Sequence, residues 1–417
     1  MVALLAAPTA LAGPDDDDDD DGEAAAELRI AAEPIVEAPA PAVYDFADDL
    51  VPETVAVSPG GARDIDLVRA AIESGGVPTA QQITAEGLFA EHDLPLRVSG
   101  RCEQTLCLRL ETIAATLIAA PAVHYLAQIG FASDLDLTSF RRPRLNLVIV
   151  MDHSSSMAGN PIETARAAAI ALVDQLGPGD QASLVSFGAA PQVLVRGVAT
   201  PDSSLTSSLA SITPAGATGL ERGLYTGFEV ARRTSVGFPG ATRVVLITDD
   251  RPTVGQTAPG AFFSLVSAAA SRGVGLTTLG VGPQFAAPLA YKLSSVRGGN
   301  VLYLRSPEHA RERIAGELDT LVTELAHALV IELDPAPGMR VTDVYGVPGE
   351  LLVREGDRVS LRVETIFLSK RRGAIYLALA PKGRANLPRE PVRTGARLGE
   401  VRLRYRALDQ ALRSDRA

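Results

Sequence analysis

The chain has 417 residues, of which 46% are hydrophobic and 21% are charged, and its net charge is −11. This composition is typical of a soluble globular protein with room for two or three domains. No apolar run approaches the roughly 20 residues that a membrane-spanning helix needs. Seven of the negative charges lie in the run Asp15–Asp21, whereas the stretch from Lys370 to Ala417 holds 13 basic and 4 acidic residues.

That basic stretch has two readings. A basic tail can meet an acidic partner, a membrane surface or nucleic acid. The favoured reading is a solvated strand face, because Arg402, Arg404 and Arg406 alternate with apolar residues as in an edge strand. No aromatic residues are interleaved with the basic ones to form a groove, so nucleic-acid binding is not expected.

The N-terminus carries features of export. The opening letters MVALLAAPTALAGP resemble the end of a signal peptide over residues 1–12, with a small-x-small site at Ala10-Leu11-Ala12. The basic region that usually precedes such a core is missing, so an Ala-rich disordered start is the alternative. Residues 13–60 join the Asp run to segments rich in Ala and Pro, and they predict a disordered acidic linker.

Residues 61–143 predict an ordered N-terminal segment. Apolar spacing favours a helix over residues 64–76 and a second helix over 79–93, capped by Thr79. A strand-like stretch follows Cys102 and Cys107, the two cysteines of the chain. Their spacing suggests a short hairpin that an oxidising compartment can close with a disulfide, although the sequence leaves that bond open.

Residues 144–325 alternate strands with helices. Strands are predicted at 144–152, 181–187, 191–198, 242–250, 274–282 and 300–304, and helices at 160–177, 202–212, 219–235, 259–273, 285–298 and 307–326. Near-continuous apolar runs in several strands indicate burial on both faces, and therefore a mostly parallel sheet covered by helices. The fold class is α/β, with a doubly wound, mostly parallel sheet.

Residues 328–410 change to a period of two. Six candidate strands separated by Gly, Pro and Asp predict a flanking all-β, sandwich-like domain. They span residues 328–335, 339–346, 350–357, 358–368, 373–381 and 400–408.

Oxygen-bearing side chains converge on one edge of the predicted parallel sheet. Asp152, Ser154 and Ser156 leave the first strand in a D-x-S-x-S spacing, Thr218 lies in the loop TPAGATGLERG, and Asp249 ends the strand VVLITDD. In an open α/β sheet, ligands bind outside the carboxyl ends of the strands. Two carboxylates and three hydroxyls suit Mg²⁺, or Mn²⁺ or Ca²⁺, rather than zinc. Because the hydroxyls are neutral, a cation bound by this set stays electrophilic enough to take one more anionic ligand, such as a carboxylate of a partner.

These residues resemble the metal-ion-dependent adhesion site of the von Willebrand factor type A (VWA) domain, over about residues 144–325. The resemblance implies that Ser154 and Ser156 bind the metal directly, that Thr218 binds it directly or through water, and that the two aspartates often act through water. One departure is Asp250, which replaces the usual Gly. This carboxylate either raises metal affinity or faces solvent.

The flanking segments are similar to those of bacterial exported VWA proteins, which carry an N-terminal VWA-associated extension and a C-terminal β domain. The chain stops soon after RLRYRAL, where such proteins tend to continue, so the last strands are expected to be incomplete.

The resemblance implies a metal-ion-dependent protein-binding module at the bacterial cell envelope or outside it, without enzymatic activity, whose partner offers an acidic residue. The alternative is a cytoplasmic VWA partner of an AAA-type ATPase. A hydrolase using His153, Ser154 and Asp249 is less favoured, because adjacent residues at a strand exit point in different directions. The sequence also lacks a G-x-S-x-G elbow and a phosphate-cradling Gly-Lys loop.

Overall fold

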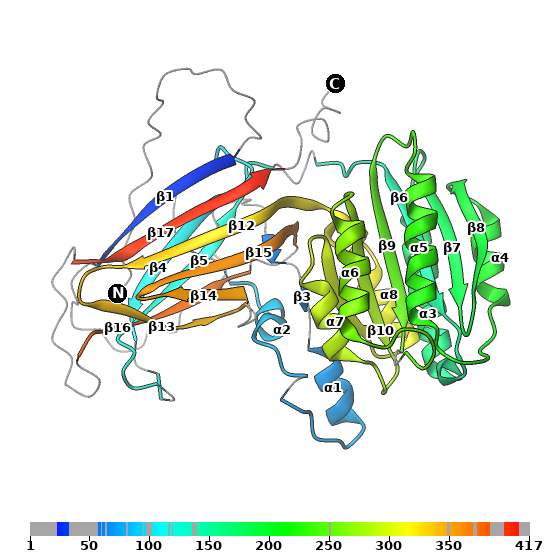
Figure 1. The fold of residues 1–417 in the computed structure, drawn as a ribbon, viewed down its shortest axis with the longest axis horizontal. Coiled ribbons are helices and arrows are strands. Elements are labelled where there is room, and N and C mark those ends of the chain that lie inside the picture. Colours follow the sequence, from blue (N-terminus) through cyan, green and yellow to red (C-terminus); the bar gives the residue numbers. More distant parts are fainter. Residues whose placement is uncertain are drawn as a thin grey trace. The chain divides into compact units, whose positions relative to one another are not determined.

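The chain forms two compact units (Figure 1). The computed structural model describes residues 23–32, 57–59, 61–62, 65–80, 82–94, 96, 102–115, 117–118, 120–135, 140–249, 252–347, 351–369, 373–383 and 396–407. Within these ranges, the residues up to Pro59, from His92 to Phe140 and from Leu325 onward make up the first unit. Those between 60 and 91 and between 141 and 324 make up the second.

The second unit is built on a seven-stranded sheet in the order β3-β11-β10-β9-β6-β7-β8. All neighbouring pairs are parallel except β7 and β8. The strands are β3 (Gly61–Ala62), β6 (Leu145–Asp152), β7 (Gln181–Phe187), β8 (Pro191–Ala199), β9 (Ala241–Thr248), β10 (Val274–Val281) and β11 (Gly299–Leu304). The predicted doubly wound, mostly parallel α/β fold is confirmed.

Helices cover both faces of this sheet because its central strands are apolar on both sides. In β6, Leu147 and Ile149 contribute to one core and Val148 and Val150 to the other. The first core also takes side chains from α3 (Asn160–Val173), α4 (Ser203–Ser211), α8 (Pro307–Ile314) and α9 (Leu318–Val322). The second takes them from α5 (Leu220–Thr234), α6 (Pro259–Ala270) and α7 (Ala287–Ser294).

Two helical predictions are wrong in detail. The helix expected over 307–326 is broken into α8 and α9 at Gly316, which has a φ of 65° that glycine adopts without a steric penalty. Beside α1 (Asp66–Glu73), the second predicted helix shrinks to α2 (Ala85–Ala90). Its cap is Thr84, whose side chain accepts a hydrogen bond from the Gly87 N–H, and not Thr79.

The first unit contains two sheets that share one apolar core. A six-stranded sheet has the order β1-β17-β12-β15-β14, with β2 paired to β15, and a four-stranded antiparallel sheet has the order β13-β16-β5-β4. All six strands predicted after residue 328 are present. The strands are β1 (Glu23–Ala32), β2 (Val57–Pro59), β4 (Cys107–Ala114), β5 (Tyr125–Ala132), β12 (Glu324–Pro335), β13 (Met339–Tyr345), β14 (Leu352–Glu355), β15 (Arg358–Leu368), β16 (Ile375–Pro381) and β17 (Ala396–Ala407).

This unit differs from the boundaries expected from the sequence. Strands β4 and β5 belong to the expected N-terminal segment 61–143, yet β5 pairs with β16 of the C-terminal part. Strand β1 lies inside the expected disordered linker 13–60 and pairs along its whole length with β17. Because β17 lies between β1 and β12, it is not the edge strand that its alternating arginines suggested. Arg402 and Arg404 instead form ion pairs with Glu400 and Glu332.

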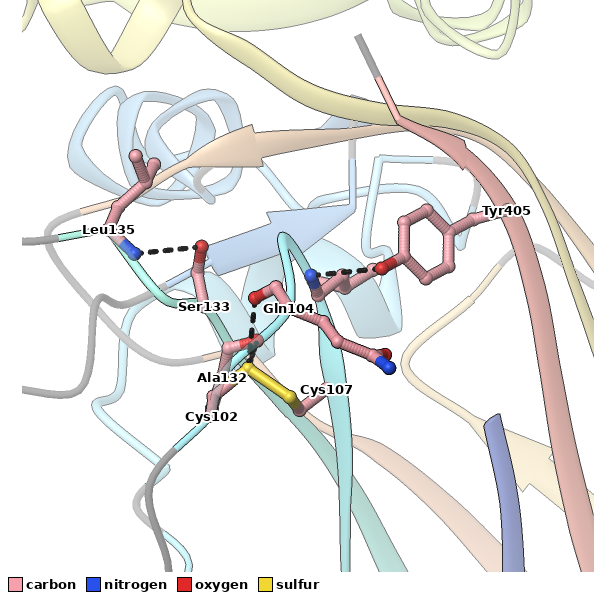
Figure 2. Close-up of a disulfide and its surroundings, with 8 residues drawn as sticks. Cys102, Gln104, Cys107, Ala132, Ser133, Leu135 and Tyr405 are labelled. Carbon is pink, nitrogen blue, oxygen red and sulfur yellow. Dashed lines mark hydrogen bonds between the residues drawn. A yellow bond between two sulfur atoms is a disulfide. The ribbon is translucent and has the colours of Figure 1, made fainter. Parts of the chain in front are cut away.

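A disulfide joins Cys102 to Cys107 at the start of β4, with a Cα–Cα distance of 5.8 Å (Figure 2). The Cys102 Sγ lies 3.1 Å from the carbonyl oxygen of Gln104 and 3.5 Å from that of Ala132. The loop between the cysteines is also attached to β17, because the Leu106 N–H donates to the Tyr405 hydroxyl at 3.3 Å. The disulfide closes a short turn before β4, whereas the hairpin that the cysteine spacing suggested is not formed, because residues 102–106 contain no strand.

The predicted signal-peptide remnant at residues 1–12 lies outside the described residues. Among the helices that the structure describes, none combines the length and apolar character needed to cross a membrane.

Close packing of α5 on the central strand leads to a first prediction. A Cβ at Gly227 would lie 2.3 Å from Cγ2 of the buried Val150. Overpacking exceeds the gain in helix propensity, so Gly227→Ala is expected to lower the free energy of unfolding by about 1–2 kcal/mol in chemical denaturation. The control is Gly260→Ala in α6, where a Cβ meets no atom within 4 Å. Equal effects of the two substitutions would contradict this account.

Candidate metal centre

The expected ligands lie where strands and loops meet at the carboxyl edge of the parallel sheet. Asp152 is the last residue of β6, and Asp249 directly follows the neighbouring strand β9. Thr218 lies two residues before α5. Parallel neighbours end at the same edge of a sheet, so strand order alone brings the two aspartates together.

Asp152 is fully buried and is held by two hydrogen bonds. Its Oδ1 accepts from the Ser154 backbone N–H at 2.8 Å, and its Oδ2 accepts from the Thr248 hydroxyl at 2.7 Å. Burial raises the pKa of Asp152, and these hydrogen bonds oppose part of that rise. The two hydrogen bonds therefore fix the orientation of the Asp152 carboxylate.

The two serines connect Asp152 to Asp249. Ser154 Oγ and Ser156 Oγ are 3.0 Å apart, and the Ser156 hydroxyl donates to Asp249 Oδ1 at 3.1 Å. Burial raises the pKa of Asp249 to about 6, and the negative charge of Asp152 adds to this rise. Four of the five expected ligands thus form one hydrogen-bonded group.

The loop that carries Thr218 is hydrogen-bonded to the backbone beside this group. The Ser155 N–H donates to the Gly216 carbonyl at 2.9 Å, and the Ala215 N–H donates to the His153 carbonyl at 2.7 Å. Thr218 itself is buried. The loop that carries it is therefore tied to both sides of Ser154.

The donor set fits a hard divalent cation. It consists of two carboxylates and three hydroxyls, all of them oxygen donors, which Mg²⁺, Mn²⁺ and Ca²⁺ prefer. A cation beside the two carboxylates would offset the cost of burying like charges. Among the described residues there is no cluster of three or more His, Cys, Asp and Glu side chains that would hold a metal in another way.

The serine-hydrolase alternative finds no geometric support at this edge. Nδ1 of His153 is buried without a hydrogen-bond partner, and the Ser154 hydroxyl pairs with Ser156. Asp250, the departure from the family pattern, lies outside the described residues.

Two residues at this edge were missed from the sequence. Thr248 orients Asp152, and Thr253 accepts a hydrogen bond from the Thr218 N–H. The sequence did offer one indication of Thr248: it directly precedes Asp249, at the end of a strand that lies beside β6.

A doubly wound sheet with oxygen ligands at its carboxyl edge is the architecture of a VWA domain. Residues 147–252 match the family model described as von Willebrand factor type A domain, so this part of the chain is a VWA domain.

Several curated proteins are similar to it. An uncharacterized protein of Synechocystis sp. is 24% identical over 220 residues, covering 52% of this chain and 51% of that protein. Human inter-alpha-trypsin inhibitor heavy chain H4 is 28% identical over 216 residues, covering 50% of this chain and 22% of that protein. Pig inter-alpha-trypsin inhibitor heavy chain H1 is 32% identical over 120 residues, covering 27% and 13%. The matches thus span 51% of the first relative and 22% or less of these two heavy chains.

Among solved structures, a von Willebrand factor type A protein from Catenulispora acidiphila gives a TM-score of 0.46 at 12% identity, covering 75% of this chain and 76% of that one. Proximal thread matrix protein 1 from the mussel byssus, solved with zinc in its MIDAS motif, gives a TM-score of 0.36 at 18% identity. That match covers 44% of this chain and 49% of that one.

The raised pKa of Asp249 leads to a prediction for metal-free protein. Its pKa is 3.8 ordinarily and about 6 in the fold, so the folded state binds more protons than the unfolded state between these values. Wild type should lose stability relative to Asp249→Asn as the pH rises from about 4 to 7, by at most about 3 kcal/mol. Denaturation in EDTA at several pH values measures this difference. A difference that does not change with pH would show that Asp249 titrates normally.

Proposed function

We propose that this chain is a metal-ion-dependent protein-binding module of the adhesion or scaffold type. Asp152, Ser154, Ser156, Thr218 and Asp249 would hold one divalent cation, Mg²⁺ or else Mn²⁺ or Ca²⁺. The cation supplies a positive charge that attracts a carboxylate. A protein partner offering an acidic residue would complete its coordination.

The observation that carries this proposal is the placement of Asp152 and Asp249. Two carboxylates that are linked through Ser154 and Ser156 are buried at one edge of the sheet, and burial raises the pKa of both. Such an arrangement is costly without a cation, because each charge lacks a positive partner within the group. A structural role as loop caps would not require both carboxylates at the same place.

The residues around the cation would have two different roles, orienting Asp152 and exposing the site to a partner. The Ser154 N–H and the Thr248 hydroxyl hold Asp152 in one orientation, so its carboxylate cannot turn away from the site. Ser156 is exposed and bridges Ser154 to Asp249, which places its hydroxyl at the mouth of the site. A partner's carboxylate would therefore approach from the side of Ser156.

We also propose an exported location, at the cell envelope or outside the cell. The disulfide between Cys102 and Cys107 supports it, because such bonds persist in oxidising compartments and are rare in the cytosol. The residues resembling a signal peptide support it independently. The competing proposal, a cytoplasmic partner of an AAA-type ATPase, leaves the disulfide unexplained.

Metal binding is tested with two neighbouring serine substitutions. Isothermal titration of the full chain with Mg²⁺ and with Mn²⁺ should show one site. Ser156→Ala should weaken it by about tenfold, equivalent to 1.4 kcal/mol, because a ligand hydroxyl is lost. Ser155→Ala is the matched control: Ser155 is also exposed, lies one position away and is not an expected ligand. If the wild type binds neither ion, or if both variants lose affinity equally, the proposed site is wrong.

The location is tested separately, by fractionating the native host. The mature protein should appear outside the cytoplasm with Cys102 and Cys107 unreactive to thiol reagents until reduced. Recovery in the cytoplasm with two free thiols would favour the ATPase-partner alternative.

A further inference from the structure

Thr218, one of the expected metal ligands, is held through its backbone by two consecutive residues, Thr253 and Val254. The Thr218 N–H donates to the Thr253 hydroxyl oxygen at 2.9 Å. The Thr218 carbonyl accepts from the backbone N–H of Thr253 at 3.0 Å and from that of Val254 at 3.2 Å. Both polar groups of the Thr218 backbone are therefore bonded to the same short segment.

The segment with Thr253 and Val254 comes shortly after Asp249, another of the expected ligands. Thr253 lies four residues after Asp249, in the connection between β9 and α6. The same connection is attached a second time to the start of α5, because the Gln256 N–H donates to Glu221 Oε2 at 3.1 Å. The connection that begins with one expected ligand thus holds the loop that carries another.

We propose that Thr253 is a positioning residue of the metal site, which fixes Thr218 relative to Asp249. This inference rests on the proposed metal binding and concerns a residue that is not itself a ligand. Its hydroxyl sets the orientation of the Thr218 peptide group, and the Thr218 side chain follows that orientation toward the cation.

The contribution of the hydroxyl is separable from the folding of the domain. Thr253 is exposed, so replacing its side chain leaves the core unchanged. Thr218 is 4% exposed, so water is a poor substitute for the acceptor that its N–H would lose. The Thr218 loop keeps its bonds from Ser155 and Ala215, and it therefore stays folded while Thr218 itself becomes less well fixed.

The experiment compares Mn²⁺ binding by the full chain carrying Thr253→Val, Thr253→Ser or Thr257→Val. Valine keeps the shape of threonine without the hydroxyl, serine restores the hydroxyl, and Thr257 is an exposed threonine of the same connection. Thr253→Val should weaken Mn²⁺ binding about fivefold, as expected for one hydrogen bond, while the other two variants stay within about twofold of wild type. Metal-free Thr253→Val should unfold cooperatively with a melting temperature lowered by no more than a few degrees, because one hydrogen bond is lost, and the other two variants should melt like the wild type.

The outcomes separate this inference from the proposed function. If the wild type binds no Mn²⁺, the proposed metal site and the positioning role of Thr253 are both wrong. If the wild type binds and Thr253→Val binds equally well, the metal site stands and the positioning role is overturned. Loss of affinity in Thr253→Ser as large as in Thr253→Val overturns it too, because the hydroxyl is then not responsible. So does a loss of cooperative unfolding in metal-free Thr253→Val, because the weaker binding would then result from a misfolded domain.

Discussion

The burial of two carboxylates, Asp152 and Asp249, is the constraint around which the carboxyl edge of the sheet is organised. Burial raises the pKa of each side chain, and the negative charge of Asp152 adds to the rise at Asp249. The polar contacts nearby reduce this cost without removing it: a backbone N–H and two hydroxyls donate to the carboxylates, and no described lysine or arginine forms an ion pair with either. Two buried carboxylates with no ion-pair partner among the described residues would be stabilised by the proposed cation.

The packing of the sheet makes this placement possible. Helix α5 must approach the central strands closely so that the loop before it, with Thr218, lies at the edge. Gly223 and Gly227 allow this approach, since a Cβ at these positions would lie 2.5 Å from Phe187 and 2.3 Å from Val150. Strand β6 therefore packs against α5 through its apolar middle and contributes Asp152 to the candidate site at its end.

The sequence predicted the parts of the molecule that local patterns determine. Apolar runs identified the parallel sheet, and the D-x-S-x-S spacing with Asp249 identified the group that the structure brings together. Other contacts between distant segments were missed, because the spacing of residues within one segment does not encode them. The hydrogen bond from Thr248 to Asp152 joins residues 96 positions apart, and the one from Thr218 to Thr253 spans 35. The pairing of β5 with β16 escaped prediction for the same reason.

Hydrogen bonds within the protein restrict the loops of the candidate site, and this bears on how a partner would bind. The loops around Ser154 and Thr218 are joined backbone to backbone, and the serine hydroxyls already link the two carboxylates. A cation would replace hydrogen bonds within an existing arrangement instead of ordering free loops, so little binding energy would be lost to conformational entropy. The remaining cost is desolvation of the cation and of the partner's carboxylate. Affinity at such a site would therefore depend mainly on the charge that the cation presents, and specificity on the residues surrounding it.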